Sequence, residues 1–122
     1  MLNYIKVALV TPKVCLGNPL QNANEILKAV NKQKNADILV FPELSITGYS
    51  LGDWVFNREL LEQAKLALKK LVEASTKQVM IVGMPLEVTG AIYNCAVVIQ
   101  NKKILGIIPK VNLPDSGEFY EK

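Results

Sequence analysis

Short apolar runs along the chain alternate with segments whose apolar residues recur at helical spacing. The runs at residues 3–10, 37–41 and 78–83 are rich in Ile, Val and Ala, which is typical of buried strands. Thr11-Pro12 ends the first run, and the second is wholly apolar after its aspartate, as expected of a central parallel strand. We therefore predict three strands here, the first of them mostly buried.

Two segments between these runs have the periodicity of amphipathic helices. We expect the first to span residues 22–33, because Asn22 and Glu25 resemble a capping box at its start. The second begins after Asn57, and its apolar stripe consists of Leu61, Ala64, Leu68, Leu71 and Val72.

The last apolar runs predict a hairpin. Residues 91–99 and 103–108 are joined by residues 100–102, which have the composition of a turn. The predicted order is β-α-β-α-β-β-β, which indicates an α/β protein with a mixed sheet and helices on one face.

Composition narrows the class of protein. At 122 residues, with 50% hydrophobic and 20% charged residues, the chain is about one small globular domain. No run is apolar enough to span a membrane, and the N-terminus does not resemble a signal peptide, so we expect a cytoplasmic protein. A net charge of +3 with scattered lysines does not favour nucleic-acid binding.

The cysteines do not predict a metal site or a nucleophile. Cys15 and Cys95 lack metal-ligand spacing, and the chain has no histidine. Cys95 lies within an apolar run, where cysteine usually acts as a small core residue. Cys15 follows the first strand, and its sequence neighbours include no evident base that would lower its pKa.

Two ionisable residues directly follow apolar runs. Glu43 comes after residues 38–41 and Pro42, and Lys110 comes after Pro109. Ligands of open α/β sheets bind beyond the carboxyl ends of strands. A carboxylate there can accept a proton from a nucleophile, and an ammonium can stabilise an oxyanion. Spacing alone favours structural roles for both residues, as a loop-stabilising carboxylate and a solvated strand end.

Motifs in this order and approximate separation are found in the nitrilase (carbon-nitrogen hydrolase) superfamily, which the chain resembles over nearly its full length. They are Phe41-Pro42-Glu43-Leu44, Gly48-Tyr49, Gly83-Met84-Pro85, Tyr93-Asn94 and Pro109-Lys110. Within the superfamily, residues 45–49, 109–110, 113–114 and 117–122 look most like the glutaminase domain of glutamine-dependent NAD+ synthetases. The resemblance implies that residues 1–122 are the N-terminal half of an α-β-β-α sandwich, truncated before the catalytic cysteine.

The resemblance also implies roles for individual residues. Glu43 would be the general base and Lys110 the oxyanion-stabilising cation. Glu121 would match a second glutamate that positions the catalytic groups, with Glu118 as the runner-up. Residues expected near the substrate are Tyr49, Ser116 and Glu118. The family's cysteine nucleophile is missing from this chain, so we expect the chain alone to be inactive.

The implied function is hydrolysis of glutamine to supply ammonia for ATP-dependent amidation of deamido-NAD+. ATP and Mg²⁺ would bind only to a downstream synthetase domain, since these residues contain no glycine-rich phosphate loop, and the protein would be a homo-oligomer. One alternative is a stand-alone amidase acting on a small ω-amide or carbamoyl compound. Another is a non-catalytic interaction module.

Overall fold

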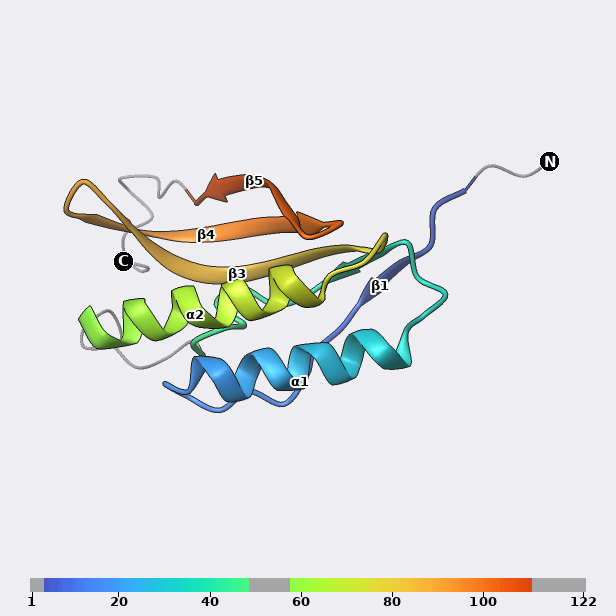
Figure 1. Ribbon diagram of the computed structural model, residues 1–122, viewed down its shortest axis with the longest axis horizontal. Coiled ribbons are helices and arrows are strands. Elements are labelled where there is room, and N and C mark those ends of the chain that lie inside the picture. The colour runs from blue at the N-terminus through green and yellow to red at the C-terminus, as the bar shows by residue number, and fades with distance from the viewer. Residues whose placement is uncertain (1–3, 49–57, 111–122) are drawn as a thin grey trace, which may run out of the picture.

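The computed structural model describes residues 4–48 and 58–110 (Figure 1). The elements are β1 (Val7–Leu9), α1 (Pro19–Lys32), β2 (Ile38–Val40), α2 (Arg58–Ala74), β3 (Val79–Val88), β4 (Ala91–Gln100) and β5 (Lys103–Pro109). The predicted order of strands and helices is thereby confirmed.

The strands form one mixed sheet in the order β1-β2-β3-β4-β5. The pairs β1–β2 and β2–β3 are parallel, and the pairs β3–β4 and β4–β5 are antiparallel. Both helices lie side by side on one face of the sheet, as predicted (Figure 1). The short parallel strands and the long antiparallel ones thus share one layer.

The core lies between the sheet and the two helices. Strand side chains alternate between the two faces of a sheet, so every second residue of β3 and β4 points toward the helices. Those at residues 80–84 of β3 and 97–99 of β4 are buried against the apolar stripes of α1 and α2, and each large side chain fully buried in this way contributes about 1.5–3 kcal/mol. The core includes Ala23, Ile26, Leu39, Ala64, Leu71, Met80, Val82, Val97 and Ile99.

The first strand is not mostly buried, and that prediction was wrong. β1 lies at the edge of the sheet, where the side chains of Val7 and Leu9 are 51% and 81% exposed. Only Ala8, between them, packs against the core. The composition of an apolar strand does not distinguish an edge position from a central one.

The predicted capping box at Asn22 and Glu25 was also wrong. Helix α1 begins at Pro19, and its N-cap is Asn18, whose side-chain oxygen accepts a hydrogen bond from Gln21 N at 3.2 Å. Asn22 therefore lies inside the helix and is buried. Pro and Asn favour this start, but Pro19 lies outside the apolar stripe from which the helix was predicted.

Strand β3 does not end at Gly83 as predicted but continues through Pro85 to Val88. Its pairing with β2 ends at Ile81, so Pro85 lies where β2 no longer requires a backbone donor. The predicted hairpin of β4 and β5 is confirmed. Its turn residues Asn101 and Lys102 both have positive φ, which is typical of a tight two-residue turn.

Exposed apolar side chains lie on both faces of the sheet in the part of the chain that the structure describes, since consecutive residues of a strand point to opposite faces. They come mainly from β4 and β5 and are 41–60% exposed: Ile92, Tyr93, Ile104, Leu105, Ile107 and Ile108. An apolar surface of this kind is typical of a face that packs against another layer.

Candidate active site

The topology brings the ends of β2 and β5 to the same edge of the sheet. Strand β2 runs parallel to β3, and β5 runs in the same direction as β3 because two antiparallel pairings separate them. Glu43, which follows β2, and Lys110, which follows β5, therefore emerge on the same side. This is the edge at which the sequence predicted a site.

Glu43 and Lys110 meet there as an ion pair. Glu43 Oε2 accepts a hydrogen bond from Lys110 Nζ at 3.2 Å. The same oxygen accepts one from Asn94 Nδ2. Among the described residues, no hydrogen-bond donor reaches Glu43 Oε1, which is therefore available to take a proton from a bound group.

Asn94 is a site residue to which sequence reasoning gave no role, although its motif was noticed. It lies on β4 opposite Pro85, and its backbone oxygen accepts a hydrogen bond from Lys110 N at 2.8 Å. One residue thus contacts both the carboxylate and the lysine. The available signal was a polar side chain inside the otherwise apolar run of residues 91–99.

These side chains line a cavity of about 330 Å³ at the edge of the sheet. The side chains of Glu43 and Lys110 are 39% and 51% exposed, so both can contact a ligand from solvent. A partly exposed ion pair contributes only about 0–1 kcal/mol to stability, which does not explain why the charges converge here. The remaining walls are largely apolar and include Phe41, Pro42, Cys95, Ile108 and Pro109.

The loop that carries Glu43, residues 42–48, is held as a compact turn. Ser45 N donates to Pro42 O at 3.1 Å, and Gly48 N donates to Leu44 O at 2.8 Å. Leu44 has a φ of +54°, a conformation uncommon outside glycine. Residues 44–48 are all buried, so Glu43 projects from a fixed backbone.

Gly83 on β3 joins the Glu43 loop to the sheet. Its nitrogen donates to Ser45 Oγ at 3.2 Å, and its oxygen accepts from Ile46 N at 3.1 Å. A Cβ at this position would collide with Leu44 N and would lie 3.0 Å from the Glu43 Cα. Only glycine allows the backbone of the loop to approach β3 this closely.

Neither cysteine is placed as a nucleophile. Cys95 lies in the cavity wall but is only 5% exposed, and burial raises the pKa of its thiol. A protonated, buried thiol is a poor nucleophile. Cys15 is partly buried in the segment before α1. Cys95 is therefore a core residue in this structure, as predicted.

We expect native Cys95 to react with a disulfide reagent at neutral pH at least ~10-fold more slowly than Cys15, because reaction requires local opening of the sheet. Timed modification followed by peptide mass spectrometry would measure both rates. In the denatured protein, the control, the two thiols should react alike. Equal rates in the native protein would contradict the assignment of Cys95 to the core.

Several predicted site residues lie outside the described residues. They are Tyr49, Ser116, Glu118 and Glu121. Within residues 4–48 and 58–110, no group of His, Cys, Asp and Glu side chains is placed to hold a metal ion. Over the same residues, no helix has the length and apolar character needed to cross a membrane.

Comparison with known proteins identifies the relatives of this chain. The sequence profile of the carbon-nitrogen hydrolases matches residues 6–122. The chain is 38% identical to the glutamine-dependent NAD(+) synthetase of Mycobacterium tuberculosis, over 98% of this chain and 18% of that protein. It is 34% identical to the glutamine-dependent NAD(+) synthetase of Acinetobacter baylyi, over 99% of this chain and 23% of that protein.

A solved structure agrees with these relatives. Glutamine-dependent NAD+ synthetase from Acinetobacter baumannii, in complex with adenosine diphosphate, superposes with a TM-score of 0.83 at 31% identity. The match covers 97% of this chain and 24% of that one. The chain thus spans about a fifth of the length of the curated relatives that it matches.

Proposed function

Because the chain belongs to the carbon-nitrogen hydrolase family, we propose that its Glu43 and Lys110 act in the hydrolysis of the side-chain amide of glutamine. The observation that carries this proposal is the convergence of Glu43, Lys110 and Asn94 on one cavity from separate strands. A cavity of about 330 Å³ is within the range of small-molecule sites.

The geometry suits a division of labour in acyl transfer. Glu43 takes the proton from a cysteine thiol while the sulfur of that thiol attacks the amide carbon. The proton then passes from Glu43 to the departing ammonia. Lys110 stabilises the negative charge that develops on the amide oxygen. Asn94 holds the Glu43 carboxylate in place. We propose that the attacking cysteine lies outside these 122 residues, so that residues 1–122 alone are inactive.

The relatives support glutamine as the amide. Their names describe glutamine-dependent NAD+ synthetases, so we propose that the ammonia serves ATP-dependent amidation of deamido-NAD+. ATP and Mg²⁺ would bind to residues outside this chain. We assign Glu121 to positioning the catalytic groups, with Glu118 as the alternative, and Tyr49, Ser116 and Glu118 to the substrate side. We also predict that the protein is cytoplasmic and forms a homo-oligomer.

The test is ammonia release from L-glutamine by the full-length protein that contains this sequence. We expect Lys110→Met to lower kcat/KM by about 10²–10³-fold, because the oxyanion loses a positive charge in the transition state. Ammonia can be measured by a coupled enzymatic assay.

The matched control is Lys103→Met, on the first residue of the same strand and away from the cavity. This variant should keep the wild-type rate. Equal rates for the Lys110 variant and the wild type would refute the role of Lys110. A wild-type protein that releases no ammonia from glutamine would refute the proposed substrate.

A further inference from the structure

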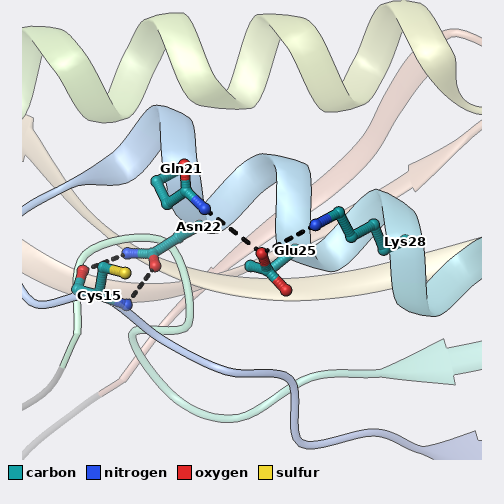
Figure 2. Close-up of polar contacts among 5 residues, drawn as sticks. All are labelled: Cys15, Gln21, Asn22, Glu25 and Lys28. Atoms are coloured by element: carbon teal, nitrogen blue, oxygen red, sulfur yellow. Dashed lines mark hydrogen bonds and ion pairs between the residues drawn. The ribbon is translucent and has the colours of Figure 1, made fainter.

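Helix α1 carries a buried amide that faces the Glu43 loop. Asn22 is 1% exposed and lies on the face of α1 that packs toward the sheet. Its Oδ1 accepts a hydrogen bond from Cys15 N at 2.6 Å, and its Nδ2 donates to Cys15 O at 2.8 Å. Figure 2 shows the two bonds between the Asn22 side chain and Cys15. The bonds that Glu25 makes with Gln21 and Lys28 belong to a separate group of contacts.

The third bond of Asn22 reaches the Glu43 loop itself. Asn22 Nδ2 donates to Ile46 O at 2.8 Å in a fully buried contact. The segment that Asn22 holds through Cys15 bonds to the same loop, because Gly17 N donates to Thr47 O at 2.8 Å. The loop is therefore attached to α1 directly and also through residues 15–17.

These bonds complete the support of the loop from two sides. On one side, Ser45 and Ile46 bond to Gly83 of β3. On the other side, the oxygen of Ile46 bonds to Asn22. The peptide around Ile46 is thus fixed between the sheet and the helix, three residues after Glu43.

An asparagine at this position is not required by the helix. Its neighbours on the buried face, Ala23 and Ile26, are apolar, and asparagine has lower helix propensity than either alanine or leucine. A buried amide is tolerated when its donors and acceptor are bonded, and such bonds select one arrangement of the groups that they join. The arrangement selected here is that of the Glu43 loop.

We propose that Asn22 is a positioning residue for catalysis. It holds the Glu43 loop so that the Glu43 carboxylate stays hydrogen-bonded to Lys110 and Asn94. This inference rests on the proposed function, in which Glu43 is the general base. Asn22 does not itself line the cavity, so its effect on the reaction passes through the backbone of the loop.

The experiment compares Asn22→Ala and Asn22→Asp with the control Asn24→Ala in the full-length protein. Asn24 is the next asparagine on α1 and makes no side-chain bond in the described part of the chain. The aspartate keeps the shape of the side chain and an acceptor for Cys15 N but has no amide donor for Ile46 O or Cys15 O. It therefore tests the same donor bonds as the alanine variant while the acceptor for Cys15 N is kept, and kcat is compared per active site that remains folded.

We expect both Asn22 variants to lower kcat by about 10- to 10²-fold, as for a displacement of about 1 Å at a catalytic group. KM for glutamine should change less than about threefold, because the loss concerns the transition state. Titration of active sites with an electrophilic glutamine analogue gives kcat per folded site, so a smaller folded fraction alone does not lower it. Hydrogen exchange should rise in residues 44–48 and stay unchanged in β4.

Each outcome separates the two proposals when Glu43→Gln is measured in parallel. Wild-type kcat per site in Asn22→Asp, together with an inactive Glu43→Gln, would overturn the role of Asn22 alone. An active Glu43→Gln would overturn both. A fall in kcat for Asn24→Ala as large as that for Asn22→Ala would also overturn the inference, because the effect would then be general to the helix.

Discussion

Glutamine hydrolysis by the full-length protein should fall by at least ~10²-fold when Glu43 is replaced with glutamine. The amide has nearly the same shape as the carboxylate, and its oxygen can still accept hydrogen bonds from Asn94 and Lys110. It cannot take a proton from a nucleophile. The variant therefore removes the chemistry of the residue while it keeps the packing of the loop, and steady-state ammonia release measures the loss.

A matched control for this variant is Glu62→Gln on α2. Glu62 is also a partly exposed carboxylate paired with a lysine, Lys65 at 3.8 Å, but it does not line the cavity. This change should leave kcat unaffected and should alter stability by no more than about 0.5 kcal/mol. A Glu43→Gln protein with more than a tenth of the wild-type rate would contradict the role of Glu43 as general base.

The second large effect is expected from Gly83→Ala. The new methyl group would meet backbone atoms of Glu43 and Leu44, which cannot move aside as a flexible side chain can. We expect a loss of about 1–3 kcal/mol in the free energy of unfolding, which is typical of overpacking. We also expect kcat to fall by about 10²-fold, because the loop must shift away from β3 and carry Glu43 with it.

Chemical denaturation and ammonia release would measure these two effects in the full-length protein. The control is Gly106→Ala on β5, where an added Cβ would have no neighbour within 4 Å. That variant should resemble the wild type in both measurements. If Gly83→Ala kept wild-type activity, the Glu43 loop would not need its close contact with β3, and the proposed origin of the geometry would be wrong.

Local patterns were sufficient to predict the order of the elements. Each apolar run or helical stripe predicts the secondary structure of its own segment, because periodicity reflects how that segment is buried. Errors arose where burial depends on position in the sheet, as for Val7 and Leu9 of β1. The sequence also placed Glu43 and Lys110 each after an apolar run, and the structure brings the two groups to 3.2 Å from each other.

By itself, then, the sequence determined the α/β arrangement and the two charged residues at the strand ends. The tertiary structure alone decided which residues hold those charges in place. Asn94 bonds to a residue 51 positions away, Gly83 to one 38 away and Asn22 to one 24 away. Such contacts depend on how strands and helices pack, and no local pattern of hydrophobic and polar residues encodes that packing.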